Sequence, residues 1–263
     1  MNLPFSPPTM ALFISFLFDR NYAASTVSTY ISALGYFHKL HGHDDPSKSF
    51  IISQMLKGYS KFDRRLDSRL PITLPLLHRL GISSANLSVS RYNIALFQAM
   101  CLFAFHTFSR IGEITHSPSN HNIQFDQLSK VLDSNNEVVS FKLTFRDYKH
   151  SYNQRPFTLN ILPSNVCCPV QFLLTYLKFR GSSPGPLFRM ADFSPVSRSH
   201  FASTLSTVLR ICSLDPTRYK GHSFRIGAAS HAADKGLSDA QIRILGRWKS
   251  NAFHKYIRIQ CVQ

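Results

Sequence analysis

The segment from Val89 to Arg110, VSRYNIALFQAMCLFAFHTFSR, constrains the fold of this chain more than any other. It predicts a helix that is apolar on nearly every face, and such a helix must be buried inside a protein. The chain has 263 residues and 44% of them are hydrophobic, so it can enclose that helix in one large domain or in one of two modest ones.

The N-terminal part predicts a small domain made of helices alone. Leu12–Arg20, Ser25–His41 and Lys48–Phe62 have the apolar spacing of three helices. Ser25 is the expected cap of the second helix, and Gly42 follows its end. The charged, proline-terminated stretch DRRLDSRLP comes next and predicts a linker between two domains.

Beyond this linker the pattern changes from helix to strand and back. A short helix at TLPLLHRLG and the long one at Val89–Arg110 come first. Two runs of alternating apolar residues then predict a β-hairpin, with Lys149 in its polar turn: Val139, Phe141, Leu143 and Phe145, then Phe157, Leu159 and Ile161. Further helices follow, and the last of them, SDAQIRILG, opens with a capping box of Ser238 and Gln241.

These patterns predict a mainly α (α+β) fold in two parts. Residues 1–66 form a small helical domain, and residues 67–263 form a mostly helical domain with a small antiparallel sheet.

The chain is strongly basic, with a formal net charge of +16 and a pI near 9.9. An excess of this size favours a polyanionic partner, with nucleic acid the leading candidate and simple solubility the alternative. The charge is concentrated after Pro216, where nine Lys and Arg residues face only Asp234 and Asp239.

Cysteine and histidine usage indicates an intracellular, reducing location and no metal site. The five cysteines are scattered apart from the adjacent Cys167 and Cys168, and no spacing resembles a zinc or disulfide framework.

The apolar stretch MALFISFLF is too short to cross a bilayer and no Lys or Arg precedes it, so neither a membrane span nor a secretory signal is expected. We expect no cofactor.

Several polar residues are candidates for chemistry, although each has an ordinary structural explanation. Arg110, at the end of the apolar helix, either binds an anion or stabilises the helix dipole. His222 and Arg225 share a helix face if that helix begins near Ser223, and they either bind an anion or form a solvated helix start. The small residues GAAS after Arg225 allow another backbone or DNA to approach closely.

The C-terminal aromatic residues are similarly open to two interpretations. Tyr256 lies between Lys255 and Arg258, and a phenol is a poor nucleophile unless cations surround it. Otherwise it is an amphipathic residue on a surface helix. Trp248, the only tryptophan, is either a hydrogen-bonding anchor or part of the core.

Taken in order, these residues resemble the tyrosine recombinase (phage integrase) family. The likeness runs from Phe108 to Tyr256, through FSRIGEIT, the hairpin lysine and GHSFRIGAASHAADKGLSDAQIRILGRW, and it is most similar to Crypton or DIRS/Ngaro mobile-element recombinases. It implies a SAM-like helical core-binding domain over residues 1–66 and a Cre-like catalytic domain over residues 67–263.

The resemblance also implies the catalytic residues. The family's first arginine falls on Arg110, its hairpin lysine on Lys149, its H-x-x-R pair on His222 and Arg225, and its tyrosine nucleophile on Tyr256. Glu113 falls on the supporting acidic position. The family's His-or-Trp position falls on Trp248, eight residues before the tyrosine, with Arg247 as the alternative at the more usual spacing of nine.

The activity so implied is metal- and ATP-independent cutting and rejoining of double-stranded DNA by a homotetramer on paired sites. The chain ends seven residues after Tyr256, whereas many members continue into a helix that docks on a neighbouring subunit, so we expect no such docking helix here. The location implied is the nucleus in a eukaryote or the nucleoid otherwise. The alternatives are a catalytically inactive, domesticated DNA-binding protein, a type IB topoisomerase, and a basic helical scaffold.

Overall fold

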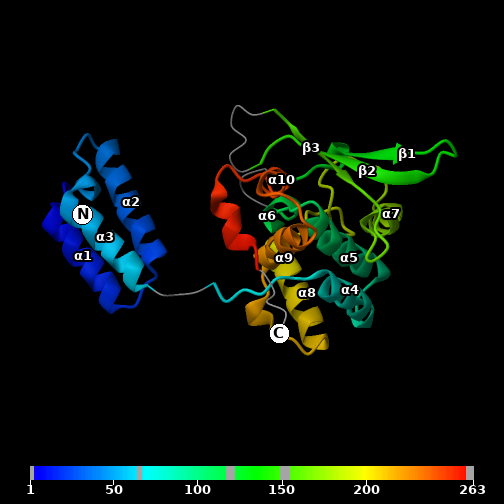
Figure 1. Cartoon of the computed structure of the whole chain (residues 1–263), viewed down its shortest axis with the longest axis horizontal. Coiled ribbons are helices and arrows are strands. Elements are labelled where there is room, and N and C mark those ends of the chain that lie inside the picture. Colours follow the sequence, from blue (N-terminus) through cyan, green and yellow to red (C-terminus); the bar gives the residue numbers. More distant parts are fainter. Residues whose placement is uncertain (1–2, 64–66, 117–121, 149–154, 259–263) are drawn as a thin grey trace. The chain divides into compact units, whose positions relative to one another are not determined.

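The computed structural model describes residues 3–63, 67–116, 122–148 and 155–258, and the chain forms two compact units (Figure 1). Unit 1 is Met1–Asp67 and unit 2 is Ser68–Gln263. Among the described residues, no helix is both long enough and apolar enough to cross a bilayer. Lys149, the predicted hairpin lysine, lies outside the described residues.

Unit 1 packs three helices around a single core. They are α1 (Pro7–Asp19), α2 (Ala24–Leu40) and α3 (Phe50–Phe62), with a short 3₁₀ helix, η1 (Pro46–Lys48), before the third. One apolar stripe from each helix meets the others, and the buried residues of this core are Met10, Ile14, Leu17, Ala24, Val27, Ile31, Ile52 and Tyr59. The predicted number and order of helices here are confirmed.

The cap predicted for α2 is wrong. The helix begins at Ala24, one residue before Ser25, and its capping position is Ala23, which has no capping side chain. The acceptor comes instead from the end of α3, where Asp63 Oδ2 accepts a hydrogen bond from the Ala24 N–H at 2.6 Å. A carboxylate satisfies this free N–H and also stabilises the positive end of the helix, so no local cap is needed.

Unit 2 is built around α5 (Arg91–His106), which lies between other helices as its apolar sequence predicts (Figure 1). α7 (Pro169–Arg180) and α9 (Gly221–Asp234) both pack against α5. The remaining elements are α4 (Leu74–Ser83), η2 (Ser84–Asn86), α6 (Ile111–Ile114), η3 (Phe125–Gln127), α8 (Arg198–Ile211), η4 (Pro216–Arg218), α10 (Asp239–Leu245) and η5 (Asn251–Tyr256).

The sheet of unit 2 has three antiparallel strands in the order β1 (Leu128–Leu132), β2 (Val138–Phe145) and β3 (Phe157–Ile161). The predicted hairpin of β2 and β3 is confirmed, with Phe141 paired to Ile161 and Phe145 to Phe157. The patterns did not predict β1. Four of its five residues are exposed, so it lacks the alternation that marks a half-buried strand.

Val139 does not continue the buried face of β2 as its spacing suggests. It is 41% exposed, whereas Phe141, Leu143 and Phe145 are buried. The register with β1 shifts between Val131 and Leu132, so that Val139 is the extra residue of a bulge. A bulge of one residue turns the following side chain to the opposite face.

The small residues of α9 allow close contact with the start of unit 2. A Cβ atom on Gly227 would lie 1.9 Å from the Ile72 carbonyl oxygen, so glycine is required there. The Ile72 N–H donates to Ser223 O at 3.0 Å, and the Leu70 N–H donates to Arg218 O at 2.8 Å. Residues 70–72 therefore run beside the first turns of α9.

Candidate active site

Arg110 lies at the beginning of a helix, not at the end of one as predicted. α5 ends at His106, the chain turns with Phe108 at φ +52°, and Arg110 becomes the capping residue of α6. Its N–H donates to Glu113 Oε2 at 2.9 Å, and its Nη1 donates to Oε1 of the same carboxylate at 3.0 Å. Stabilisation of a helix C-terminus is thus ruled out as the role of Arg110.

Glu113 is a buried carboxylate, 4% exposed, that holds two arginines. Besides Arg110 it accepts from Arg247 Nη2 at 2.7 Å. Burial raises the pKa of Glu113, but the charges of Arg247, Arg110 and Arg225 together outweigh burial and leave the pKa below its ordinary value. Glu113 is therefore ionised and serves as the counter-charge of the cluster.

Arg247 points into the protein. Its Nη1 donates to Thr107 O at 3.2 Å, and its guanidinium stacks on the Phe145 ring with 3.7 Å from Cζ to the centroid. Together with the ion pair to Glu113, these contacts join the α5–α6 turn, strand β2 and the turn after α10. Both Nη atoms are thus engaged inside the protein, so Arg247 has the geometry of a support.

Arg225 is fully buried at the centre of the cluster. Its Nη1 donates to Phe108 O and its Nη2 to Gly246 O, both at 2.8 Å, while its Nε has no partner. Burial, followed by repulsion from Arg110 and Arg247, lowers the pKa of Arg225 to about 9, against the opposing effect of Glu113 and Tyr256. A buried cation with unused N–H donors favours an anion beside it.

Tyr256 lies beside this cluster with two other aromatic rings. Its ring centroid is 5.2 Å from that of Trp248 and 6.1 Å from that of His222, and Arg225 Cζ is 5.6 Å from it. Trp248 also covers the Arg225 guanidinium at 4.3 Å. The Trp248 ring packs directly on Gly246, where an added Cβ would lie 1.5 Å from the indole, so this turn requires glycine.

The backbone around Tyr256 is tied to α9. Tyr256 is the last residue of the 3₁₀ helix η5. The Ser230 hydroxyl, on α9, donates to Tyr256 O at 3.4 Å and accepts from the Arg258 N–H at 2.8 Å. These two bonds hold the tyrosine over the helix that carries His222 and Arg225.

Seven of the eight predicted residues therefore come together. Arg110 and Glu113 come from α6, His222 and Arg225 from α9, and Arg247, Trp248 and Tyr256 from the segment after α10. Within the described residues, the guanidinium groups of Arg110, Arg225 and Arg247 surround one carboxylate, Glu113. The excess of positive charge beside a phenol makes this a site for an anionic group.

No family model matches the sequence, and no curated protein matches it either. Solved structures do match. A XerH site-specific recombinase, in a post-cleavage complex with palindromic difH substrate, has a TM-score of 0.68 at 14% identity, over 98% of this chain and 67% of that one. A lambda integrase dimer bound to a COC′ core site has a TM-score of 0.65 at 14% identity, over 99% and 84%.

The Tn1549 transposon integrase, in complex with circular intermediate DNA, has a TM-score of 0.60 at 12% identity, over 97% and 81%. This chain has the tyrosine-recombinase fold. The predicted fold class, mainly helical with a small antiparallel sheet, is confirmed. At these identities, the likeness to the three proteins concerns the tyrosine-recombinase fold and not their substrates.

Two further cations lie near His222 and were not predicted. Burial lowers the pKa of His222, and the charges of Arg69, Arg225, Arg198 and Arg110 lower it further. Arg69 comes from the start of unit 2 and Arg198 from the first residue of α8. Neither lies near a recognisable motif, and their proximity depends on contacts between distant segments, so no local sequence signal could have revealed them.

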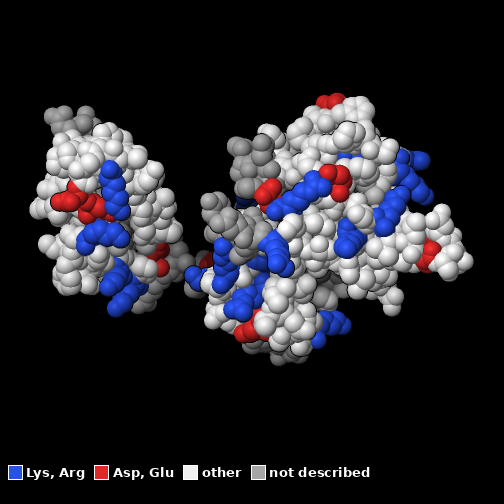
Figure 2. Space-filling view, turned by 90° about the horizontal axis from the view of Figure 1, so that it is seen from above, with Lys and Arg blue, Asp and Glu red and all other residues white. Residues whose placement is uncertain are grey.

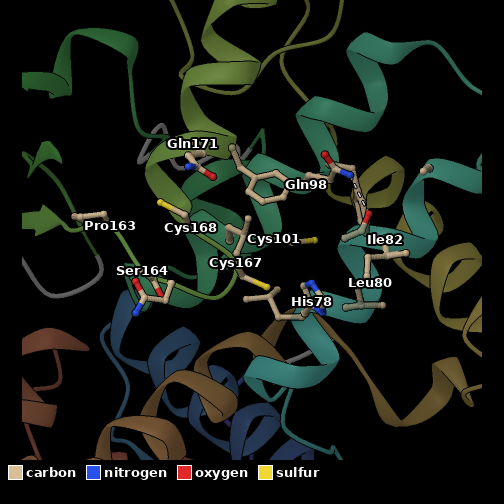
Figure 3. Close-up of a pocket in the computed structure, with 17 residues that line it drawn as sticks. His78, Leu80, Ile82, Gln98, Cys101, Pro163, Ser164, Cys167, Cys168 and Gln171 are labelled. Atoms are coloured by element: carbon tan, nitrogen blue, oxygen red, sulfur yellow. Dashed lines mark hydrogen bonds between the residues drawn. The ribbon is translucent and has the colours of Figure 1, made fainter. Parts of the chain in front are cut away.

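A concavity of about 750 Å³ lies between α4, α5 and α7, and it shares no residue with the arginine cluster (Figure 3). Figure 3 shows His78, Gln98, Cys101, Cys168 and Gln171 among the side chains around it. None of its described lining residues is charged, so it lacks the cations that a phosphate requires. Elsewhere too, the described residues contain no group of His, Cys, Asp or Glu that could hold a metal ion.

Proposed function

We propose that this chain is a tyrosine-type site-specific recombinase that cuts and rejoins DNA through a 3′-phosphotyrosyl intermediate. The observation that carries the proposal is the position of Tyr256 within 6.1 Å, ring centre to ring centre, of His222 and 5.6 Å from the buried Arg225 guanidinium. A nucleophile beside unused cationic donors suits attack on a phosphodiester.

The arginines would stabilise the charge that gathers on the non-bridging oxygens during attack. A guanidinium has five N–H donors, and Arg225 uses two of them on carbonyl oxygens. Arg110 is partly exposed while Glu113 and its own helix hold it in place. Arginine offers paired donors to a phosphate, which lysine cannot do.

His222 and Trp248 would complete the cradle. Because burial and the surrounding guanidinium groups hold its pKa below the ordinary value, His222 is neutral at pH 7 and donates through one ring nitrogen. Trp248 offers its indole N–H from the position stacked on Arg225. Since both Nη atoms of Arg247 are engaged inside the protein, Trp248 rather than Arg247 suits the donor role.

The proposed step is balanced without an added cofactor. The Tyr256 phenol releases its proton to water as its oxygen bonds to phosphorus, the bond from phosphorus to the 5′-oxygen breaks, and Lys149 gives a proton to the departing 5′-oxygen, which leaves as a 5′-hydroxyl. The phosphotyrosyl bond keeps the energy of the broken phosphodiester, so ATP is not needed. A 5′-hydroxyl from a second strand reverses the step, and two rounds exchange duplexes.

The wider proposal concerns the assembly. Residues 1–66 would be the core-binding domain and residues 67–263 the catalytic domain, acting as a homotetramer on paired double-stranded sites inside the cell. The net charge of +16 supports a DNA partner, and Figure 2 shows Lys and Arg outnumbering Asp and Glu on the visible face of unit 2. A mobile element is the proposed source.

A covalent trapping experiment tests the chemistry even though the target sequence is not known. A library of nicked duplexes with randomised sequence is incubated with the protein, and adducts that survive denaturation are isolated. Cleavage close to a nick releases a short fragment that carries the 5′-hydroxyl. Because this fragment diffuses away and can no longer reverse the step, the adduct accumulates. We expect DNA joined to Tyr256, identified by mass spectrometry, and the recovered sequences define a cleavable duplex.

Two variants make the test specific. Tyr256→Phe should form no adduct yet bind duplex DNA as the wild type does, whereas the matched variant Tyr219→Phe, at a tyrosine of the same unit outside the cluster, should form it normally. An adduct that persists in Tyr256→Phe rules out this nucleophile. Binding with no adduct in any variant would instead support the inactive DNA-binding protein.

A further inference from the structure

Arg69 is brought to the candidate site by the segment that opens unit 2. The residues after it form backbone bonds with the region where α9 begins, through Leu70 to Arg218 O and then Ile72 to Ser223 O. The close approach of Ile72 to Gly227 shows that this segment packs tightly on α9. Arg69 is therefore held beside His222, the first functional residue of that helix.

Arg198 reaches the same place from a different element. It is the first residue of α8, after the cap Ser197. Two residues earlier, Val196 O accepts a hydrogen bond from the His116 N–H at 2.7 Å, which ties the start of α8 to the end of α6. Arg110 is the capping residue of α6, and Arg198 is an exposed residue at the start of α8. The bond between His116 and Val196 therefore joins the two elements that carry these arginines.

The charges at His222 support this placement. After burial, the guanidinium groups of Arg69, Arg225, Arg198 and Arg110 are the influences that lower its pKa. A phosphodiester carries one negative charge, and Arg110 and Arg225 already suffice to pair with it. Phosphates of one strand follow each other with an axial rise of about 3.4 Å, so further cations at the rim meet the neighbouring phosphates.

We propose that Arg69 and Arg198 bind the DNA phosphates that flank the scissile one, so that the site recognises a run of phosphates along one strand. This inference rests on the proposed function, because it takes duplex DNA as the substrate. It assigns to the two arginines the positioning of the strand, while Arg110 and Arg225 contact the reacting phosphate. Arg69 is the second residue of unit 2, so the first residues of this unit would themselves contact DNA.

The first test measures binding alone and does not require cleavage. Affinity for a fixed duplex of about 30 base pairs is measured from low to moderate salt for the wild type, Arg69→Gln, Arg198→Gln and the control Arg210→Gln. Arg210 is also exposed on α8, twelve residues further, which is about 18 Å along the helix. Each lost phosphate contact should reduce the slope of log affinity against log salt by about 0.9 and weaken binding about 5- to 20-fold.

Arg69 needs a second variant because it is half-buried. Arg69→Lys keeps the charge, so it should restore most of the salt slope. If Arg69→Lys binds as poorly as Arg69→Gln at every salt concentration, then Arg69 acts through packing and its part of the inference is wrong. The unfolding midpoint of each variant, followed by circular dichroism, should match that of the wild type.

The second test locates the contacted phosphates on the cleavable duplex recovered by trapping. One methylphosphonate, which carries no charge, replaces the phosphate on either side of the scissile one. If an arginine binds that phosphate, its Gln variant should bind the neutral substrate with the same affinity as the wild type does. The losses of affinity from the two changes should therefore not add. Arg210→Gln should behave as the wild type on every substrate.

The outcomes separate this inference from the proposed function. If Arg69→Gln and Arg198→Gln show the salt slope of Arg210→Gln, the inference is overturned even when Tyr256 forms its adduct. If their slopes fall while no variant forms an adduct, the phosphate contacts stand and the recombinase chemistry fails. Fully additive effects with both methylphosphonates would show that the contacts lie elsewhere along the DNA.

Discussion

Unit 2 contains two pairs of buried arginines, and they differ in how their N–H donors are used. Arg180 and Arg189 are 3% and 4% exposed, and Arg225 and Arg247 are 0% and 6% exposed, so burial does not distinguish the pairs. Arg180 donates to five backbone carbonyl oxygens after α7 and stacks on the Phe125 ring at 4.1 Å. Arg189 donates back to Arg180 O and to a serine hydroxyl.

Arg225 and Arg247 differ from Arg180, whose five N–H donors are all used. The Nε atoms of Arg225 and Arg247 are buried without a partner, and Arg225 lies beside Tyr256. Saturated guanidinium groups such as Arg180 hold a loop in place, because no donor remains for a ligand. Unused N–H donors next to a phenol, as at Arg225 and Tyr256, distinguish the candidate site from such a loop. A buried arginine therefore indicates function only when its hydrogen bonds have been counted.

The largest expected effect is on catalysis at Arg225. Arg225→Lys keeps a positive charge but loses the paired donors, so single-turnover cleavage of the recovered duplex should fall about 10³-fold, or about 4 kcal/mol of transition-state stabilisation. Arg180→Lys should cleave at the wild-type rate per folded molecule. Equal losses in the two variants would mean that the comparison between the pairs has no functional content.

The next effect is on stability at Glu113. Glu113→Gln leaves the buried Arg247 without its counter-charge, so the free energy of unfolding in urea should fall by about 3 kcal/mol at pH 7. Because the folded-state pKa of Glu113 is below its ordinary value, its ionisation stabilises the fold above the ordinary pKa, and this is lost as pH falls through the folded-state pKa. In the Gln variant, the free energy of unfolding should therefore decrease less steeply as the pH falls into the acid range.

Arg180→Lys should affect stability and not DNA binding or cleavage, in contrast to Arg225→Lys. Lysine has three donors and no planar fork, so several of the carbonyl oxygens that Arg180 serves lose their partner. We expect the free energy of unfolding to fall by about 2 kcal/mol while duplex binding stays unchanged. A loss of DNA affinity in the folded variant would show that the loop after α7 also belongs to the DNA surface.

The smallest effects concern the ring that covers each guanidinium. Trp248→Phe should slow cleavage about 5-fold, or about 1 kcal/mol, because the indole N–H and part of the stacking on Arg225 are lost. Phe125→Leu removes the corresponding ring from Arg180 and should lower the unfolding midpoint by a few degrees without changing cleavage. If Phe125→Leu slowed cleavage as much, stacking would not be specific to the site.

Much of the fold could be predicted because its signals are local. The burial of Phe97, Phe103 and Phe105 on α5 follows from an apolar segment too long for the surface, and the β2–β3 hairpin follows from alternation. The capping box of Ser238 and Gln241 is present as predicted. β1 and the bulge at Val139 were missed because exposed strands and register shifts leave no clear periodicity.

The candidate site divides in the same way. The sequence pointed to Arg110, His222, Arg225, Trp248 and Tyr256, because their succession resembles the tyrosine recombinase family and each residue type suits phosphate chemistry. Three-dimensional packing alone made Arg110 a helix start, turned Arg247 inward onto Glu113, and brought Arg69 and Arg198 to His222. The physical reason is separation along the chain. Arg247 and Glu113 are hydrogen-bonded although they lie more than a hundred residues apart in the sequence, and only the packing of helices brings such partners together.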